Sequence, residues 1–484
     1  MNWCAWPVSG KWRWKWISGE CSPSQSHDAR SLNHRVHVSR LKAFTVSAGL
    51  SVLFLVVYSG CNWIAGQRGQ VASFYFQWER AIPFVPLMIL PYMSIDLFFI
   101  AAPFLCRTDE ELRIFSRRVV AAILIAGLCF LLFPLRFAFP RPHASGRLGG
   151  IFDWFRGMDS PFNLLPSLHA ALLLLLLDLY ARNLRGVFLI AAMFWFFLIG
   201  LSPVLTYQHH VIDIVGGFAL AGYCFYLFRE PSLALPVLVN RRISSYYAAG
   251  AAAVLLMGAI FWPWGVLLLW PANGLGIVAI AYFGAGPIIF HKTKGKLPWS
   301  TRFVLAPCLL GQYLSLLYYR RQCRSWDEVT PRIWIGGKLG SGSAKKALCS
   351  GVTSVLDLSA EFSEAKPFRK INYRNIPVLD LTAPTQAQLA QMGEFIGNHS
   401  RDGAVYVHCK IGYSRSAAAV AAYLIMSGKA NTVEEAFAII RRVRPSIVIR
   451  PEVISALSEF ALSPRCSSDG SDSFLLALDR AAPS

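Results

Sequence analysis

Long apolar runs separated by short polar or basic loops dominate the chain up to about residue 290. Each run is close to the roughly 20 residues that a helix needs to cross the hydrocarbon core of a bilayer. The runs lie at about 43–66, 81–106, 119–139, 168–181, 187–206, 211–228, 245–263 and 266–290. The fourth run is the shortest, so we expect the polar segment before it to pack in protein or at a water-facing rim. The pattern predicts a polytopic all-α membrane bundle of about eight spans.

From about residue 326 the pattern changes to short strand-like runs that alternate with helical segments. The strand-like runs are residues 332–335, 353–358, 376–379 and 404–407, and the helical segments are about 385–400, 415–428 and 432–443. This alternation predicts a soluble α/β domain with a mostly parallel sheet covered by helices. The expected organisation is a basic tail (1–42), a membrane domain (43–228), additional membrane helices with a linker (229–325), the α/β domain (326–465) and a second tail (466–484).

An ambiguous apolar segment at about 301–319 separates the two patterns. It follows the basic loop 291–296 and ends at Arg320 and Arg321. If this segment crosses the membrane, the C-terminal domain lies outside. If it lies in the interface or folds back, that domain lies inside, and the terminal arginine pair favours this second arrangement.

Composition and charge support a membrane protein. Hydrophobic residues make up 55% of the 484 residues and charged residues only 15%, with a net charge of +20. These values exclude a wholly soluble enzyme, a disordered chain and a small disulfide-stapled domain. Arginines concentrate on alternate loops, at positions 107, 113, 117, 118, 182, 185, 229, 241 and 242. By the positive-inside rule these loops and the N-terminus are cytoplasmic, so 140–167 and 207–210 face outward and the charge requires no nucleic-acid partner.

Two further features of the composition bear on partners. The 11 cysteines are scattered, without a CxxC pair or zinc spacing, so neither a disulfide framework nor a structural metal is expected. The N-terminal tail alternates basic residues and tryptophans from Lys11 to Trp16. This patch fits an interfacial anchor on the cytoplasmic leaflet or a disordered tail, and both interpretations stay open.

A cysteine-containing loop follows the strand-like run 404–407 and precedes an Ala-rich helical run. Such a loop can point backbone N–H groups inward as an anion cradle, and the helix dipole favours a phosphate. The residues expected to bind phosphate here are Lys410, Ile411, Gly412, Tyr413, Ser414 and Ser416. Arg415 can grip two phosphate oxygens, and the same field lowers the pKa of the Cys409 nucleophile. Ser416 can also donate a hydrogen bond to the sulfur as it leaves.

The stretch from His408 to Ser416 resembles the HCxxGxxRS signature of dual-specificity protein tyrosine phosphatases. The resemblance covers about 330–460 and is strongest to the mitochondrial-type lipid phosphatase of this class, which acts on phosphatidylglycerophosphate. It implies that Asp380 is the general acid that protonates the leaving alcohol. The alternatives are a chance Cys and Arg in a structural turn and a phosphate-binding pseudophosphatase.

A second constellation lies in the apolar half, on the face expected to be outward. His209 and Asp213 are one helical turn apart, so the carboxylate can fix the imidazole tautomer. His169 begins the preceding span from the same side and can serve as the acid for the leaving group. Arg141 and Ser167 are the expected phosphate ligands.

These residues resemble the motifs of the type-2 phosphatidic acid phosphatase superfamily, over about 80–228. In that superfamily a histidine attacks the phosphoryl group and forms a phosphohistidine. The chain departs from the motifs at Pro203, where the superfamily has Arg, and at Pro134, where it has Lys. Arg136 and Arg147 are candidates for the missing charge. The distantly related sphingolipid headgroup transferases also vary this motif.

Satisfied core histidines and a metal site are the alternatives for this constellation, the latter formed by His143, His169, His209 and Asp213. Our hypothesis is a bifunctional inner-membrane phosphatase of bacterial type without cofactors. It hydrolyses phospholipid phosphate monoesters through phosphohistidine in the membrane and phosphocysteine in the C-terminal domain, which we expect to be cytoplasmic. The alternative is a membrane-anchored protein tyrosine or serine phosphatase that acts on phosphoproteins, with the membrane half an inactive scaffold or a lipid headgroup transferase.

Overall fold

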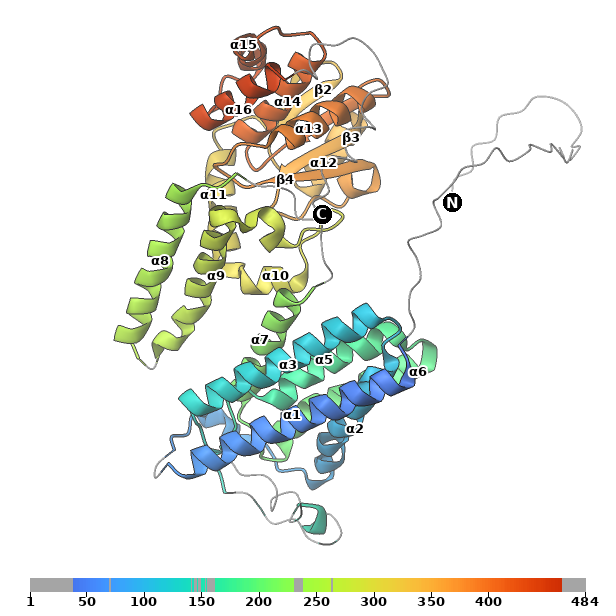
Figure 1. Cartoon of the computed structure of the whole chain (residues 1–484), viewed down its shortest axis with the longest axis vertical. Coiled ribbons are helices and arrows are strands. Elements are labelled where there is room, and N and C mark those ends of the chain that lie inside the picture. Colours follow the sequence, from blue (N-terminus) through green and yellow to red (C-terminus); the bar gives the residue numbers. More distant parts are fainter. Residues whose placement is uncertain are drawn as a thin grey trace, which may run out of the picture.

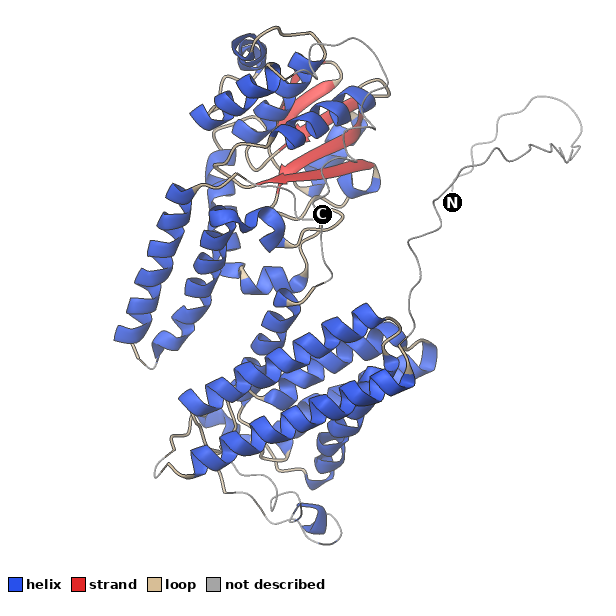
Figure 2. Cartoon of the chain, in the orientation of Figure 1, coloured by secondary structure: helices blue, strands red, loops and turns tan. Residues whose placement is uncertain are grey.

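The computed structural model describes residues 38–68, 71–140, 142, 146, 149–152, 154, 162–229, 238–262 and 264–463. A helical part is followed along the chain by an α/β domain (Figures 1 and 2). The predicted tryptophan-rich anchor and most of both predicted tails lie outside the described residues. The predicted fold class, a helical membrane bundle followed by an α/β domain, is confirmed.

The first helical bundle packs around one apolar core. Its helices are α1 (Arg40–Gly66), α2 (Ile89–Leu105), α3 (Asp109–Leu132), α5 (Leu168–Asn183), α6 (Gly186–Leu205) and α7 (Val211–Leu227). Two short 3-10 helices, η1 (Gln77–Ala81) and η2 (Pro86–Met88), precede α2. The helices α1, α2, α3 and α5 lie side by side at the front of this bundle (Figure 1).

The third predicted span, 119–139, was wrong at both ends. Helix α3 begins at Asp109 because the Thr108 side chain accepts a hydrogen bond from Glu111 N at 3.1 Å, and the acidic first turn suits a helix N-terminus. The helix ends at Leu132, two residues before Pro134, which cannot continue a helical ladder. Three of the arginines assigned to a loop therefore lie on a helix.

A second group of helices joins the bundle to the α/β domain. It consists of α8 (Arg241–Ile260), η3 (Trp264–Leu268), α9 (Leu269–Ile280), η4 (Ala281–Ala285), η5 (Gly286–Phe290), α10 (Trp299–Val304) and α11 (Ala306–Arg320). Helices α8 and α9 form a hairpin that extends away from the α/β domain (Figure 1). The ambiguous segment 301–319 is divided at Leu305 into α10 and α11.

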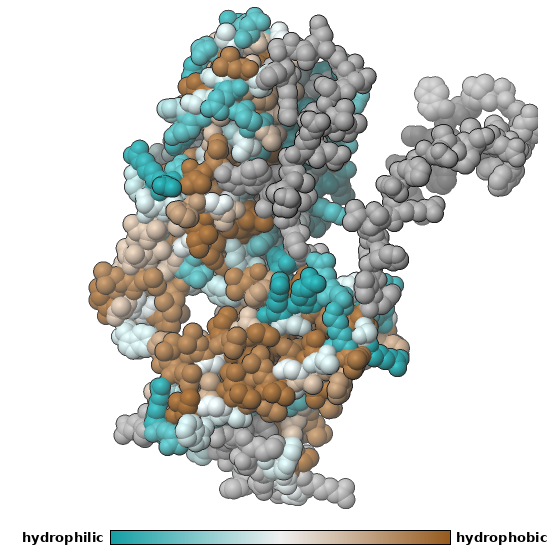
Figure 3. Space-filling model, in the orientation of Figure 1, coloured by the Kyte–Doolittle hydropathy of each residue, from teal (hydrophilic) through white to brown (hydrophobic). Residues whose placement is uncertain are grey.

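Six helical segments in the described part are long and apolar enough to cross a membrane. They are Arg40–Gly66, Pro86–Leu105, Asp109–Leu132, Gly186–Leu205, Arg241–Ile260 and Trp264–Phe290. The other two predicted spans form the shorter apolar helices α5 and α7, and α11 has only 15 residues. Apolar side chains cover much of the visible surface of the bundle and of the α8–α9 hairpin (Figure 3), as expected for contact with lipid.

The α/β domain contains a sheet of five strands in the order β1-β2-β5-β3-β4. The strands are β1 (Trp326–Thr330), β2 (Ile333–Gly336), β3 (Val352–Ser359), β4 (Asn372–Val378) and β5 (Ala404–His408). Only β1 and β2 pair antiparallel, so the predicted mostly parallel sheet is confirmed. The edge strand β1, with no continuous apolar run, was not predicted.

Helices cover both faces of this sheet (Figure 2). They are α12 (Ser341–Cys349), η6 (Phe368–Lys370), α13 (Gln386–His399), α14 (Ser414–Met426), α15 (Val433–Val443) and α16 (Pro451–Ala461). One core contains α13, α14, α15 and α16, and a second core contains α12. Strand β5 is central and completely buried, and the parallel strands β3, β4 and β5 end at the same edge of the sheet. This edge holds the cysteine loop.

Candidate active sites

The predicted cysteine loop connects the end of β5 to the start of α14. The Cys409 sulfur is buried, lies 3.3 Å from the Ser416 hydroxyl oxygen and accepts a hydrogen bond from Gly412 N at 3.3 Å. Gly412 has a φ of 86°, and a Cβ there would lie 2.5 Å from the Gly336 carbonyl carbon. Glycine is therefore required for the loop to turn its N–H groups toward the sulfur.

Arg444 holds this loop from behind. Its side chain is 1% exposed and donates to the carbonyl oxygens of Gly412 at 2.9 Å and Ile411 at 3.0 Å. The Asp327 carboxylate, 2.7 Å away, neutralises the guanidinium. Because Arg444 binds the loop carbonyls, it favours the orientation in which the amide groups face the sulfur. Arg444 was not predicted to belong to the site.

The guanidinium of Arg415 is fixed by a fork of hydrogen bonds. Its Nη1 and Nη2 donate to the two carboxylate oxygens of Glu361 at 3.1 and 2.7 Å, and Nη1 also donates to Val378 O at 2.9 Å. Both Arg415 and Glu361 are buried. Glu361 was not predicted, although its position just after β3 places it at the sheet edge where sites are found.

Asp380 follows β4, and its carboxylate lies close to the guanidinium of Arg415. One carboxylate oxygen lies 3.3 Å from Arg415 Nη2 and the other 3.7 Å from Lys410 Nζ. The side chain of Asp380 is 32% exposed, so it is accessible from the open side of the loop. The structure thus brings together Cys409, Arg415 and Asp380, as the sequence predicted.

Electrostatics favour a thiolate at Cys409. Burial alone would raise the pKa of this thiol, but the charge of Arg415 and the hydrogen bonds from Ser416 and Gly412 lower it below its ordinary value. A thiolate is a much better nucleophile than a thiol. The arrangement can therefore attack a phosphorus atom held between the loop amides and Arg415.

A buried ionic cluster lies behind Cys409. His408 Nδ1 is 3.2 Å from Cys409 O, and its Nε2 lies 2.7 Å from Glu364. Asp357, Glu364 and His408 have donor atoms close enough to hold a metal ion. However, the ammonium of Lys292 lies 2.5 Å from Asp357 and supplies the positive charge that this cluster needs. Lys292 belongs to the loop after η5, and nothing in its local sequence marks it as a partner of Asp357.

The histidine constellation lies where α5, α6 and α7 meet. His209 Nδ1 is 3.6 Å from the Asp213 carboxylate, and both side chains are buried. Ser167 N donates to Asp213 O at 2.9 Å, which joins the start of α5 to α7. His169, in the first turn of α5, has its Nε2 3.4 Å from Ile199 O of α6. The predicted residues His169, His209, Asp213 and Ser167 thus share one region.

The structure gives His210 a partner that the sequence did not suggest. Its Nδ1 lies 2.8 Å from Glu79 of η1, its Nε2 accepts from Ala138 N at 3.1 Å, and its ring stacks on Phe137. Both His210 and Glu79 are buried. This pair fastens the segment before α7 to the opposite loops. The His210 imidazole therefore faces Glu79, while the His210 backbone N–H donates to the Asp213 carboxylate at 2.8 Å.

Only some of the predicted phosphate ligands of the histidine site lie among the described residues. Arg141, His143 and Arg147 lie outside the described residues. Pro203 is buried inside α6, and its carbonyl oxygen accepts from Gln208 N at 2.9 Å and His209 N at 3.1 Å. The backbone carbonyl at this position therefore closes the turn that precedes His209. Arg136 is exposed.

Comparison with known proteins gives two family matches. The dual specificity phosphatase catalytic domain matches residues 333–462, and the PAP2 superfamily matches residues 116–230. The human phosphatidylglycerophosphatase and protein-tyrosine phosphatase 1 is 30% identical over 183 residues, which cover 35% of this chain and 90% of the relative. The phosphatidylglycerophosphate phosphatase PTPMT2 of Arabidopsis thaliana is 29% identical over 162 residues, or 31% of this chain and 71% of the relative. A crystal structure of PTPMT1 in complex with PI(5)P is 27% identical, covers 28% of this chain and 95% of that chain, and has a TM-score of 0.27.

Proposed function

This chain belongs to the family of dual-specificity phosphatases that includes phosphatidylglycerophosphatase and protein-tyrosine phosphatase 1, and we propose that its C-terminal domain hydrolyses phosphate monoesters of phospholipids. The chain is a phosphoric monoester hydrolase that carries a PAP2 region before this domain. The observation that carries the proposal is the Cys409 sulfur next to the buried Arg415–Glu361 fork.

In the proposed first step, the Cys409 thiolate attacks the phosphorus and the bond to the lipid alcohol breaks. The loop amides and Arg415 stabilise the negative charge that develops on the phosphoryl oxygens. Asp380 gives its proton to the departing alkoxide. In the second step, water attacks the phosphocysteine and Asp380 takes a proton from it. Ser416 donates a hydrogen bond to the sulfur as inorganic phosphate forms, and the thiolate returns.

Lipid substrates are favoured because the catalytic domain contacts the membrane-capable segment Trp264–Phe290, where the Tyr282 hydroxyl donates to Asp380 O at 2.8 Å, and the neighbouring helix α11. Lys410, the residue after the nucleophile, donates to Gln312 Oε1 at 2.7 Å and Ser315 Oγ at 2.9 Å, both on α11. A bilayer supplies its own lipids to such a site at high effective concentration. The names of the two relatives quoted above support the same substrate class.

The test compares phosphatidylglycerophosphate with a phosphotyrosine peptide. The full-length protein in nanodiscs carries His209→Ala so that only the cysteine site contributes. We expect a kcat/KM at least about 100-fold higher for the lipid, and loss of turnover in an added Cys409→Ser variant. A preference for the peptide would overturn the lipid proposal in favour of a protein phosphatase.

For the membrane half we propose a second, histidine-dependent site. His209 Nε2 is the nucleophile because Nδ1 faces Asp213, and His169 protonates the leaving group. The buried His209–Asp213 pair favours this function over an inactive scaffold, because ionisable groups buried in membrane segments are rare and usually have a functional role. In a Cys409→Ser protein, His209→Ala should abolish hydrolysis of phosphatidic acid. Unchanged hydrolysis would support the scaffold, and transfer of a labelled headgroup to an added alcohol would support the transferase.

We further propose that the two sites face opposite membrane surfaces. His209 directly precedes α7, whereas the cysteine domain contacts the N-cap of α8 and η4, the segment after α9. The short α11, which contacts the catalytic loop, favours the arrangement in which 301–319 folds back. A C-terminal reporter active only in the cytoplasm should be active, and an inactive reporter would contradict this topology.

A further inference from the structure

The membrane-side helices α8, α9 and α11 form one wall of the cysteine site. Tyr282, in η4 directly after α9, donates from its hydroxyl to Asp380 O at 2.8 Å. Asn240, which caps α8, donates to Leu381 O at 3.0 Å. Together with the bonds from Lys410 to α11, these contacts fix the helices directly beside the proposed general acid. Access to Arg415 from this side passes between the helices and the catalytic domain.

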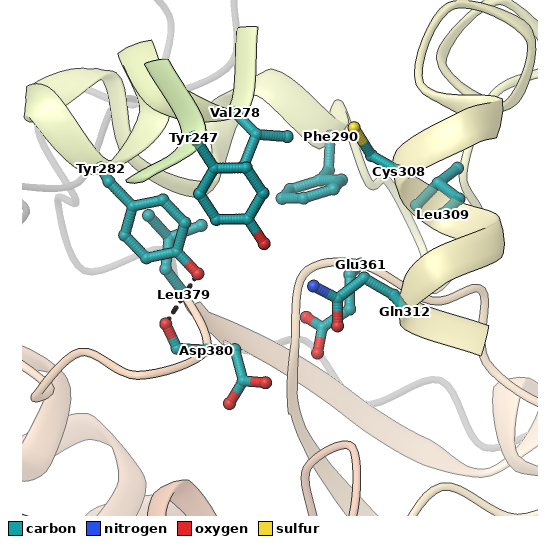
Figure 4. A pocket seen from close by; sticks show the side chains of 10 residues that line it. All are labelled: Tyr247, Val278, Tyr282, Phe290, Cys308, Leu309, Gln312, Glu361, Leu379 and Asp380. Carbon is teal, nitrogen blue, oxygen red and sulfur yellow. Dashed lines mark hydrogen bonds between the residues drawn. The ribbon is translucent and has the colours of Figure 1, made fainter. Parts of the chain in front are cut away.

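A narrow cleft lies at this junction (Figure 4). Its lining residues are Tyr247, Val278, Tyr282, Phe290, Cys308, Leu309, Gln312, Glu361, Leu379 and Asp380. The helices contribute mainly apolar and aromatic groups, whereas the catalytic domain contributes two carboxylates. Both carboxylates contact Arg415, so the polar end of the cleft is continuous with the phosphate site.

The apolar end of the cleft leads toward the α8–α9 hairpin. Farther along this hairpin, large apolar side chains are exposed, among them Ile260, Trp264 and Leu267, each at least 67% exposed. Their helices are long and apolar enough to cross a membrane. A polar end at the phosphate site and an apolar end beside a lipid-facing hairpin match the amphipathic shape of a phospholipid with a terminal phosphate.

We propose that this cleft binds the glycerol and the first acyl methylenes of a phospholipid phosphomonoester while its phosphate occupies the Cys409 loop. Substrate then enters sideways from the bilayer, and α8, α9 and α11 are the specificity-determining part of the cysteine site. This inference rests on the proposed lipid function. It adds that the membrane helices recognise the lipid rather than only anchor the enzyme.

The first experiment obstructs the cleft with Leu309→Trp. Leu309 lines the cleft, whereas the next residue, Leu310, is 58% exposed on the outer face of α11 and gives the matched control Leu310→Trp. Both are made in full-length His209→Ala protein. The measured quantity is the ratio of kcat/KM for dioleoyl phosphatidylglycerophosphate in nanodiscs to kcat/KM for soluble p-nitrophenyl phosphate.

We expect Leu309→Trp to lower this ratio at least about 10-fold, because the larger side chain would occupy the space proposed for the acyl methylenes. Leu310→Trp should leave the ratio unchanged. An unchanged ratio in Leu309→Trp would overturn the inference while the lipid activity of the parent protein still stands. A parent protein that does not hydrolyse the lipid would instead overturn the proposed function.

A second measurement does not depend on the stability of the tryptophan variant. The Cys409→Ser protein binds a phosphatidylglycerophosphate analogue with a diazirine near the start of one acyl chain, and crosslinks are mapped by mass spectrometry. Crosslinks to Val278, Phe290 or Leu309 are expected. Crosslinks confined to the outer face of the hairpin, at Ile260 or Leu267, would overturn the inference.

Discussion

The cysteine site and the histidine site are built in opposite ways. Cys409 lies in a contiguous loop in which the Gly412 amide and the charge of Arg415 act on the sulfur, while Arg444 binds the loop carbonyl oxygens from behind. His209 Nδ1 lies 3.6 Å from the Asp213 carboxylate one turn away, whereas the proposed acid, His169, comes from a different helix, α5. The difference follows from the nucleophiles, because a thiolate needs a positive field whereas an imidazole needs a carboxylate to fix its tautomer.

The two sites also differ in how they are tied to the rest of the molecule. Behind the cysteine loop, the ionic cluster reaches Lys292 in the linker helices, 65 residues from Asp357. Near His209, the Glu79–His210 pair only joins neighbouring loops of the first bundle. We therefore expect the cysteine site, but not the histidine site, to depend on the helices between 241 and 320.

The largest expected effect separates the two sites directly. Arg415→Lys should lower kcat/KM of the cysteine site about 1000-fold, because a lysine cannot form the two-pronged grip on phosphate or on Glu361. Hydrolysis of phosphatidic acid by the histidine site should not change. Arg441→Lys, on an exposed part of α15, is the control and should affect neither activity. Equal losses in both activities would refute the independence of the sites.

The link through Lys292 predicts a change in stability. Lys292→Met leaves the buried Asp357 carboxylate without its main partner, which should lower the free energy of unfolding of the C-terminal domain by about 3 kcal/mol. Lys296→Met, at an exposed position in the same loop, should have little effect. Hydrogen exchange of the full-length protein measures both. Equal protection in the two variants would show that Lys292 does not join the two parts.

The same pair predicts a pH dependence. Burial alone would raise the pKa of Asp357, but Lys292 and His408 lower it below its ordinary value. The resulting stabilisation is present above the ordinary carboxyl pKa and is lost as pH falls through the lowered, folded-state pKa. Lys292→Met should therefore shift acid unfolding of the domain to higher pH. An unshifted acid transition would argue against the pair.

The histidine site is tested by Asp213→Asn. An amide can hold the imidazole in the wrong tautomer, so hydrolysis by this site should fall about 100-fold. Activity of the cysteine site on phosphatidylglycerophosphate should be retained. Glu110→Gln, at an exposed position on α3, is the control. Retained histidine-site activity in Asp213→Asn would remove Asp213 from the proposed mechanism.

The smallest effect concerns Ser416. Its hydroxyl helps to lower the pKa of Cys409, so Ser416→Ala should raise that pKa and move the acidic limb of the kcat/KM profile to higher pH. Loss of one hydrogen bond to a charged sulfur should reduce the rate near neutral pH about 10-fold. Ser427→Ala, beyond the end of α14, should leave the profile in place. A shift in both variants would exclude a specific effect on the thiolate.

Local sequence was sufficient to predict the cysteine loop and most of the helices and strands. The signature of the loop is contiguous, and strands β2, β3 and β5 have clear apolar runs. The residues that could not be predicted are those that contact the site from distant parts of the sequence. Arg444, Glu361 and Lys292 act on the site from other elements, and only the folded chain brings them to it. The start of α3 was missed because its charged first turn resembles a loop until its capping bond is seen.

The central claim, that one chain contains two independent phosphoryl-transfer sites, is tested most directly by trapping the phosphoenzymes. Purified protein is mixed rapidly with radiolabelled phosphatidylglycerophosphate or phosphatidic acid and quenched, and the labelled residues are located by mass spectrometry. Label is expected on Cys409 and on His209, with each lost only in its own variant, Cys409→Ser or His209→Ala. Absence of label from both residues, or loss of both labels in a single variant, would show that the chain does not contain two independent sites.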